Sequence, residues 1–366
     1  MLTSILVFIV VLSVLIIAHE AGHFLAAKRA GILVEEFGLG LPPRVLGKKI
    51  GETIYSLNLF PFGGFVRLHG ENLDEDIKKP NRAFLNKSKK VRSAIVIAGV
   101  TMNFILGILA FAVVYSVSGI PRETKNVKVV DVAVSSPAQV AGVLAGDVIR
   151  GVDKKEIVST EEFIALVEEK KGQKITLEIE RDGSAKKITL TPRVDPPENE
   201  GALGVVITGT EIYFPPWWQR PFIGVYYGTQ EAIFWGKTVL LGFVNIFQEL
   251  FAGRTPKDIS GPVGIFAITS EAAKSGILTL INFVGVLSIN LGILNIIPFP
   301  ALDGGRLLFI VLEKIIGRRV LPKIEAAIHA VGMIVLLLLL LAVTASDIKR
   351  LIVAGSISGF LESVLK

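Results

Sequence analysis

The run His19-Glu20-Ala21-Gly22-His23 near the amino terminus combines two imidazoles and a carboxylate at helical spacing. Side chains four residues apart share a face of a helix, so both imidazoles can bind one metal ion. Glu20 is not needed as a ligand and can instead take a proton from a water molecule at the metal. The alternative is that these polar residues only bond within a helix interface. That alternative is weak because the surrounding segment is apolar, and ionisable groups are costly there.

A catalytic zinc site needs a third protein ligand and keeps one position open for water. The chain contains 4 histidines and no cysteine, so His69 and His329 are candidates. Asp303 is a better one, because it ends a long uncharged stretch and is followed by two glycines. Prolines and glycines break the helix there, and the freed backbone groups are tolerated only inside protein or beside a wet cavity. The alternative role for Asp303 is helix capping.

The composition predicts a membrane protein and excludes a soluble enzyme. The 366 residues are 51% hydrophobic and 20% charged, and the charges are bunched between long apolar stretches. Each stretch supplies the about 20 apolar residues that a helix needs to cross a bilayer. The first lacks a basic leader and a small-residue cleavage site, so we expect it to be a mature transmembrane helix rather than a signal peptide. We therefore predict an α-helical polytopic membrane protein with four transmembrane helices: 1–30, 93–121, 275–302 and 326–346.

The distribution of charge predicts the orientation of these helices. The net charge is +6, but the basic residues flank apolar spans, which indicates cytoplasm and anionic membrane lipid rather than nucleic acid. Basic clusters before the second span and after the third place both loops in the cytoplasm. Both termini and the segment between the second and third spans then lie outside. This topology brings Asp303 to the same membrane face as His19 and His23.

Two segments between the spans have patterns of their own. Residues 31–92 form a basic segment on the cytoplasmic side, and within it residues 53–68 are strand-like around a Pro-Phe-Gly-Gly turn. Residues 122–193 alternate short strands with two helices at nearly balanced charge. Their length is that of one small soluble domain.

The remaining segments are predicted to connect these parts. Residues 194–274 are expected to be a linker and an amphipathic juxtamembrane segment. Residues 232–247 within it resemble a fifth span, but Lys237 and flanking acids favour an amphipathic helix on the membrane surface or packed against the core. Residues 303–325 are expected to form a cytoplasmic loop, and residues 347–366 a carboxy-terminal tail.

The sequence resembles the site-2 proteases, which are zinc intramembrane metalloproteases, and most closely their RseP-type (regulator of sigma-E protease) branch. The resemblance extends along nearly the whole chain, through the runs 19–23, 51–53, 62–66, 260–262, 290–295 and 302–305. It implies one Zn²⁺ per chain, held by His19, His23 and Asp303, with Glu20 as the catalytic residue that activates water.

The resemblance also implies the nature of the inserted parts. Residues 53–68 are expected to be a membrane-reentrant β-loop, and residues 122–193 an α+β PDZ-like domain. The best-known proteobacterial members carry two PDZ domains in tandem, whereas this chain has room for one. Substrate-binding roles are implied for the amides Asn290 and Asn295. An exposed strand of the β-loop is expected to pair with an unwound substrate, through Ile54, Tyr55, Ser56, Leu57 and Asn58.

The implied function is regulated intramembrane proteolysis in the bacterial inner (cell) membrane. The substrate is expected to be a single-span protein already shortened by a first protease, such as an anti-sigma factor or a signal-peptide remnant. The PDZ-like domain either binds a new carboxy terminus or excludes bulky substrates, and the sequence does not choose between these roles.

Rival hypotheses remain open at the level of the sequence. One is a membrane-anchored PDZ adaptor with a vestigial metal site, and another is a metal transporter that uses the same residues. Asn290 and Asn295 can also serve as helix–helix hydrogen bonds in the membrane, and residues 53–68 as a structural hairpin.

Overall fold

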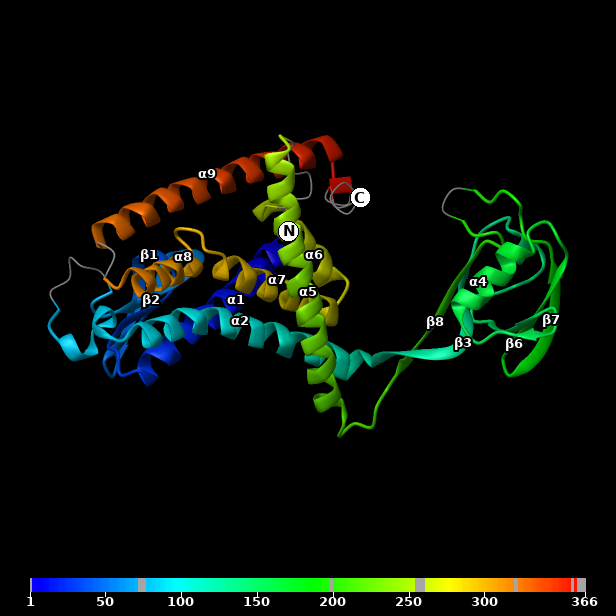
Figure 1. Ribbon diagram of the computed structural model, residues 1–366, viewed down its shortest axis with the longest axis horizontal. Coiled ribbons are helices and arrows are strands. Elements are labelled where there is room, and N and C mark those ends of the chain that lie inside the picture. The colour runs from blue at the N-terminus through cyan, green and yellow to red at the C-terminus, as the bar shows by residue number, and fades with distance from the viewer. Residues whose placement is uncertain are drawn as a thin grey trace. The chain divides into compact units, whose positions relative to one another are not determined.

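The chain divides into two compact units in the computed structural model (Figure 1). Met1–Val117 and Trp218–Lys366 form the first, here called the membrane unit, and Ser118–Trp217 form the second, here called the sheet unit. The structure describes residues 2–71, 77–197, 200–253, 261–318, 322–356 and 359–360. The predicted features at Ser260 and at residues 361–366 of the tail lie outside these ranges.

Within the described ranges, four helices of the membrane unit are long and apolar enough to cross a bilayer, in agreement with the four predicted spans. The shortest has 20 residues, and its length of about 30 Å is enough to cross the hydrocarbon core. Their apolar residues lie all round the helix rather than on one stripe, as expected where lipid surrounds them. They are α1 (Leu2–Arg29), α2 (Lys89–Ser118), α7 (Ile277–Ile296) and α9 (Pro322–Ala354).

Helix α5 (Arg220–Phe251) contains the segment predicted to be amphipathic, and it begins well before that segment. It is not among the candidate spans in the described part of the chain. The helix crosses α2 and α7 (Figure 1), and Ala232 packs there against Phe111, Ile289 and Ile293. Glu231 is satisfied by bonds from the Tyr115 hydroxyl (2.9 Å) and the Trp235 indole (3.0 Å). This pairing accounts for an acid in so apolar a helix.

Helix α8 (Asp303–Ile316) corrects the prediction of a loop at 303–325. Its sequence is amphipathic, and Phe309 and Ile310 on its apolar face are buried. A carboxylate in the first turn favours the helix through its dipole. Gly317 ends the helix in the left-handed conformation, at φ 77°.

Helix α6 (Pro262–Lys274) begins at the Gly261-Pro262 pair and is held by α9. The buried Asp347 accepts hydrogen bonds from the backbone N–H groups of Gly261 and Gly264, both at 2.9 Å. A Cβ at Gly261 would lie 2.9 Å from the Asp347 carboxylate. Glycine at this position therefore lets α9 cap α6.

Strands β1 (Val34–Ile50) and β2 (Thr53–Leu68) fold into one curved sheet, followed by the short 3₁₀ turns η1 (Pro80–Arg82) and η2 (Phe84–Asn86). Residues 36–39 of β1 pair both with residues 54–57 and with residues 64–67 of β2. Residues 54–58 pair on their other side with residues 44–49. The prediction that 54–58 form an exposed edge is therefore wrong. The edge beside α1 is 64–68, where a Cβ on Gly64 would lie 2.6 Å from Ile16.

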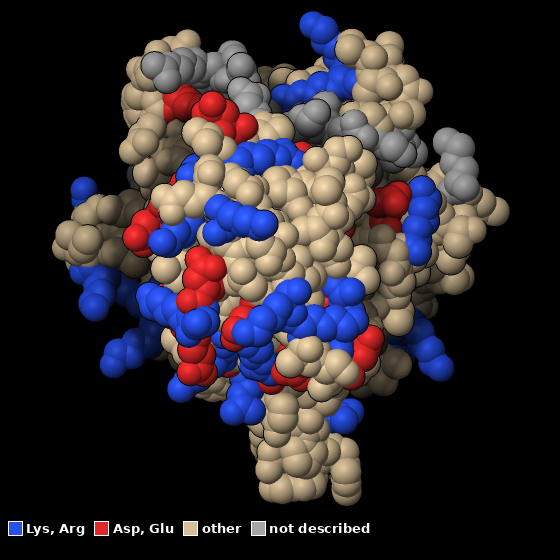
Figure 2. All heavy atoms as spheres, turned by 90° about the vertical axis from the view of Figure 1, so that its right-hand side faces the viewer, with Lys and Arg blue, Asp and Glu red and all other residues tan. Residues whose placement is uncertain are grey.

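The sheet unit is an antiparallel sheet with two helices over a core of aliphatic residues and Phe163. The strand order is β7-β6-β4-β3-β8, and β5 pairs with β4. Acidic and basic side chains are interspersed on the face of this unit in Figure 2. Its elements are β3 (Ile120–Val132), α3 (Pro137–Val140), β4 (Val148–Val152), β5 (Lys155–Glu156), α4 (Thr160–Glu169), β6 (Ile175–Arg181), β7 (Ser184–Leu190) and β8 (Val205–Tyr213).

The sheet unit extends beyond the predicted domain of residues 122–193. Strand β8 lies in the segment predicted to be a linker, and it pairs along β3 from Ile120 to Val132. Without β8, one edge of β3 would lose its backbone hydrogen bonds.

Asp147→Asn is expected to destabilise the sheet unit by about 1.5–3 kcal/mol, since it weakens charge-assisted bonds to a buried group. Asp147 is 1% exposed and accepts bonds from Arg181 Nε (2.6 Å), Arg181 Nη2 (2.7 Å) and Leu144 N (2.9 Å). Burial alone would raise the pKa of Asp147, but the hydrogen bonds from Arg181 and Leu144, together with the positive charges of Arg181 and Lys186, outweigh it and lower that pKa.

A lowered folded-state pKa stabilises the unit above the unfolded pKa, and this stabilisation is lost as pH falls through the folded pKa. Wild-type stability should therefore decline below about pH 4, more steeply than that of Asp147→Asn. Hydrogen exchange of the strands in the full chain measures both effects. Glu180→Gln, in the exposed pair with Arg150, is the control and should change little. Equal rates of hydrogen exchange in Asp147→Asn and Glu180→Gln would contradict the prediction.

Candidate metal centre

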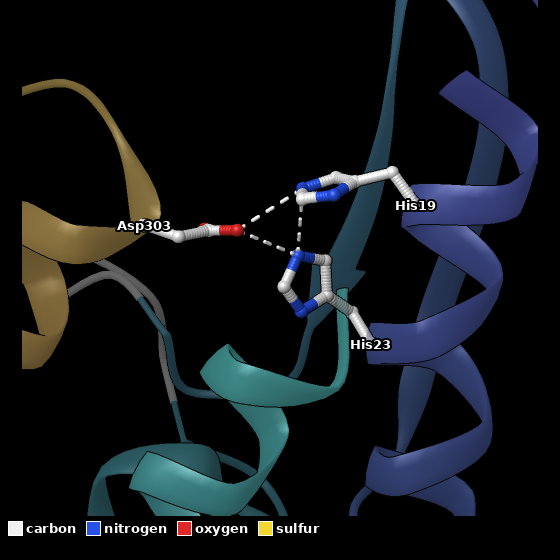
Figure 3. Close-up of side chains that lie close together, drawn as sticks. All are labelled: His19, His23 and Asp303. Atoms are coloured by element: carbon white, nitrogen blue, oxygen red, sulfur yellow. Dashed lines mark hydrogen bonds and ion pairs between the residues drawn. The ribbon is translucent and has the colours of Figure 1, made fainter. Parts of the chain in front are cut away.

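The structure brings together the three predicted ligands from two helices (Figure 3). His19 and His23 lie one turn apart on α1, and Asp303 is the first residue of α8. Asp303 Oδ2 is 3.0 Å from His19 Nε2 and 3.1 Å from His23 Nε2. The two Nε2 atoms are 3.2 Å apart.

These three atoms fit a tetrahedral zinc ion. Zinc bonds of 2.0–2.1 Å place neighbouring ligand atoms of a tetrahedron about 3.3 Å apart, close to the three separations observed. Asp303 Oδ2 is buried and, within the described ranges, faces no hydrogen-bond donor other than the two imidazole nitrogens. Two imidazoles and a carboxylate, one open side and no thiolate match the donors of a catalytic zinc site.

The backbone of α2 lies directly against the histidines because two glycines remove the side chains between the helices. A Cβ on Gly22 of α1 would be 2.2 Å from the carbonyl oxygen of Ala98, and one on Gly99 would be 2.4 Å from His23 Nε2. This close approach lets His23 Nδ1 donate to the carbonyl oxygen of Ile95 at 2.8 Å. Asn103 contacts His19 Nδ1 at 3.1 Å.

Gly99 and Asn103 are not among the site residues predicted from the sequence. A signal was present, because Gly99 and Asn103 are four residues apart on an apolar helix and therefore share a face. A polar amide in a membrane span is itself a candidate for function.

The turn before α8 places Asp303. Helix α7 ends at Ile296, and Ala301 has a positive φ of 78°. The N–H of Ala301 donates to His329 Nδ1 of α9 at 3.0 Å. A Cβ on Gly304 would lie 2.1 Å from the carbonyl oxygen of Ile297, so the chain can reverse here only with glycine.

A buried ion pair holds the other end of α8. Glu313 of α8 pairs with Arg92 at the start of α2, and each side chain is 5% exposed. Lys89 adds a hydrogen bond to the carbonyl oxygen of Glu313 at 2.7 Å. The helix that carries Asp303 is therefore fixed at both ends.

The other candidate ligands lie elsewhere. His69 Nδ1 pairs with Glu35 at 2.8 Å, and its Nε2 accepts the N–H of Lys79 at 3.2 Å. His329 supports the Ala301 turn. Within the described ranges, His19, His23 and Asp303 form the one group of three or more metal-binding side chains.

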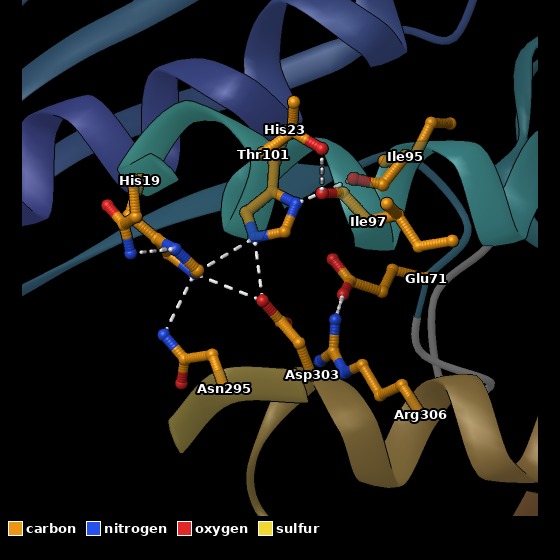
Figure 4. A network of polar contacts seen from close by, with 10 residues as sticks. His19, His23, Glu71, Ile95, Ile97, Thr101, Asn295, Asp303 and Arg306 are labelled. Atoms are coloured by element: carbon orange, nitrogen blue, oxygen red, sulfur yellow. Dashed lines mark hydrogen bonds and ion pairs between the residues drawn. The ribbon is translucent and has the colours of Figure 1, made fainter. Parts of the chain in front are cut away.

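A cavity of about 390 Å³ opens beside the three ligands. Glu20 lines it, as do residues 64–68 of β2. Arg306 and Glu71 form an ion pair across it (Figure 4). The negative charge of Glu71 raises the pKa of Arg306 above its ordinary value, so the guanidinium stays charged beside the site. The three metal ligands, the carboxylate of Glu20 and the strand edge 64–68 therefore line the same cavity.

The predicted substrate-binding residues divide into near and far groups. Asn295 Nδ2 lies 3.5 Å from His19 Nε2 (Figure 4), whereas Asn290 has no such contact with the ligands, and neither amide is among the residues that line the cavity. Their spacing of five residues puts them on different faces of α7.

The five residues predicted as an edge strand do not line the cavity either. Ser56 donates to Glu36 at 2.7 Å, and Asn58 donates to the carbonyl oxygens of Leu39 (3.2 Å) and Gly40 (3.1 Å). Tyr55 packs against Phe37. These contacts, like the strand pairing on both sides, are structural.

Comparison with known proteins agrees with this site. The sequence profile of peptidase family M50 matches residues 7–339. The zinc metalloprotease RasP of Oceanobacillus iheyensis is 30% identical over 429 residues, covering 96% of this chain and 100% of that protein. RasP of Geobacillus kaustophilus is 29% identical, covering 95% and 98%. A relative from Clostridium acetobutylicum is 35% identical, covering 94% and 97%.

Solved PDZ domains are similar to a short part of the chain. That of an SdrC-like protein from Listeria monocytogenes is 21% identical and covers 23% of this chain and 88% of its own, with a TM-score of 0.21. A score this low does not assign the fold of the sheet unit.

The family profile spans most of the chain, including both metal-binding segments, and relatives named as zinc metalloproteases align over nearly its whole length. Together with the apolar helices, these matches show a membrane protein. The chain belongs to peptidase family M50, the site-2 proteases, and is a zinc metalloendopeptidase of the site-2 type.

Proposed function

We propose that this protease hydrolyses a peptide bond within the transmembrane segment of a single-span membrane protein. The observation that carries the proposal is the strand edge 64–68, which lines the same cavity as Glu20 and the three ligands. A transmembrane helix hides its carbonyl groups in its own hydrogen bonds. A substrate must therefore unwind, and an unpaired strand edge can bind the extended segment by β-augmentation.

The residues that line the cavity, and Asn295 beside His19, have distinct proposed roles. Residues 64–68 align the extended substrate, and the side-chain amide of Asn295 adds a donor and an acceptor for its backbone. Glu20 takes a proton from the attacking water and returns it to the leaving amine. One zinc ion per chain, held by His19, His23 and Asp303, supplies Lewis-acid polarisation of the carbonyl and activation of water.

The substrate is proposed to be a membrane protein that another protease has already shortened, such as an anti-sigma factor or a signal-peptide remnant. The cavity is small, at about 390 Å³, and suits one extended segment. We propose that the sheet unit acts as a PDZ-like selector outside the cytoplasm of a bacterial inner membrane. Strand β8 ends the order of its sheet and so offers an edge for an incoming carboxy terminus.

Removal of zinc is expected to stop cleavage reversibly. The full chain in detergent or liposomes is dialysed against a chelator and then supplied with zinc, and cleavage of a single-span reporter is followed by mass spectrometry. Cleavage should be lost and then return, with a new terminus inside the apolar segment. A new terminus outside that segment would contradict intramembrane proteolysis. Intact reporter under every condition would favour a membrane-anchored adaptor.

A further inference from the structure

We infer that Asn103 is a positioning residue for the metal ligand His19, and that its side-chain oxygen faces His19 Nδ1 when zinc is bound. The inference rests on the zinc site and not on the proposed substrate. Asn103 lies on α2 and is neither one of the three metal ligands nor the proposed general base Glu20.

Asn103 is well placed for this role. Its side chain is fully buried at 0% exposure, and its Nδ2 lies 3.1 Å from His19 Nδ1. Ser288 of α7 donates to the backbone carbonyl of Asn103 at 2.8 Å, which ties this part of α2 to α7. Asn103 Oδ1 is buried and lacks a hydrogen-bond partner among the residues that the structure describes.

The proton on His19 decides which amide atom faces it. If Nδ2 donates to Nδ1, the proton of the neutral imidazole must sit on Nε2. His19 Nε2 is the atom that faces Asp303 and His23, and a protonated nitrogen has no lone pair for a metal. Zinc binding therefore requires Nδ1–H, which needs an acceptor.

Exchanging the oxygen and nitrogen of the amide supplies that acceptor at the same position. The two ends of an Asn side chain have nearly the same shape, and hydrogen bonding normally decides between them. After the exchange the amide nitrogen, instead of the oxygen, lacks a hydrogen-bond partner, so the number of unpaired atoms is the same in both orientations of the amide. The orientation is decided by His19 Nε2, which needs a free lone pair to bind zinc.

The second histidine already shows this arrangement. His23 Nδ1 lies 2.8 Å from the carbonyl oxygen of Ile95, and a carbonyl can only accept. Ile95, Gly99 and Asn103 are spaced by four residues along α2 and form one stripe toward the histidines. The stripe thus supplies one acceptor for each imidazole, with a glycine between them. Such partners of metal ligands typically contribute 10–100-fold to metal affinity.

The test compares two replacements of Asn103 in the full chain. Asn103→Leu keeps the shape and removes the acceptor, and Asn103→Asp supplies oxygen without an amide N–H. Zinc affinity is measured by competition with a chromophoric chelator, and ligand geometry by the absorption spectrum of the Co²⁺-loaded protein. Ser288→Ala, which removes the bond to the Asn103 backbone, is the control for packing. Thermal unfolding of the metal-free proteins reports folding separately.

We expect Asn103→Leu to bind zinc about 10–100-fold more weakly, with an altered Co²⁺ spectrum and unchanged metal-free unfolding. Asn103→Asp and Ser288→Ala should stay within about threefold of the wild type. Wild-type affinity in Asn103→Leu would overturn the inference, as would equal losses in the Leu and Asp variants. If Asn103→Leu does not fold, Asn103→Asp decides alone. A tenfold loss of zinc affinity in Asn103→Asp would show that the amide N–H is needed, which overturns the inference, and affinity within threefold of the wild type supports it. None of these readouts depends on proteolysis.

Discussion

Replacing Glu20 with glutamine is expected to abolish proteolysis while zinc stays bound. Glu20 lines the cavity beside the ligands, but its carboxylate is not part of the three-ligand group. Glutamine has nearly the same shape and cannot accept the proton of the attacking water. Loss of a general base typically costs about 10²–10⁴-fold in rate. Metal analysis and reporter cleavage on the same preparation measure the two properties separately.

The matched control for this prediction is Glu271→Gln on α6. Glu271 is exposed and makes an ion pair with Lys274 at 3.1 Å, so its loss should change neither zinc content nor rate. Asp303→Ala provides the opposite pattern, because removing a ligand should lower zinc content together with activity. A Glu20→Gln protein that cleaves at the wild-type rate, or that loses zinc as Asp303→Ala does, would show that Glu20 has been given the wrong role.

The metal ligands were predictable because the sequence features that identify them are a short local spacing and the order of the apolar spans. The spacing of His19 and His23 matches one helical turn, and four spans bring Asp303 to their face whichever way the chain is inserted. The structure then places the three atoms within 3.2 Å of one another. The apolar helices were predictable for a similar reason, since length and composition suffice to identify them.

The strand edge at the cavity was not predictable, because it depends on pairing between distant residues. Residues 54–58 and 64–68 both have strand-like composition, and only the register of β1 shows that residues 36–39 lie between them. Strand β8 was missed for the same reason, since Val205 pairs with Val132 of β3, which lies far earlier in the chain. Helix α8 was not predicted because the basic residues of 303–325 were used only to place this segment on the cytoplasmic side.

Close packing between helices also leaves little trace in a sequence. Gly22 and Gly99 look like any small residues in apolar helices, although each lies where a methyl group would overlap the neighbouring helix. The need for glycine comes from the interhelical distance, and that distance follows from the bond between His23 and the Ile95 carbonyl. The metal site and the helix contact are therefore one structural feature.

Gly99→Ala is expected to lower zinc affinity by more than about 100-fold, because it disturbs the ligand and its partner on α2 together. The added Cβ would lie 2.4 Å from His23 Nε2, 2.5 Å from His23 Cε1 and 2.9 Å from His19 Cε1. His23 cannot turn away without losing its 2.8 Å bond to Ile95. The helices would have to separate, which moves both imidazoles relative to Asp303.

Helix propensity makes this prediction a sharp one. Alanine is favoured over glycine by about 1 kcal/mol inside a helix, so the substitution should stabilise α2 if contacts did not matter. Gly242→Ala on α5 is the matched control, because nothing lies within 4 Å of its added Cβ. It should keep wild-type zinc affinity and unfold at the same or a higher temperature. If Gly99→Ala behaves like Gly242→Ala, the imidazoles do not need the close approach of α2, and the positioning of both ligands must come from α1 and α8 alone.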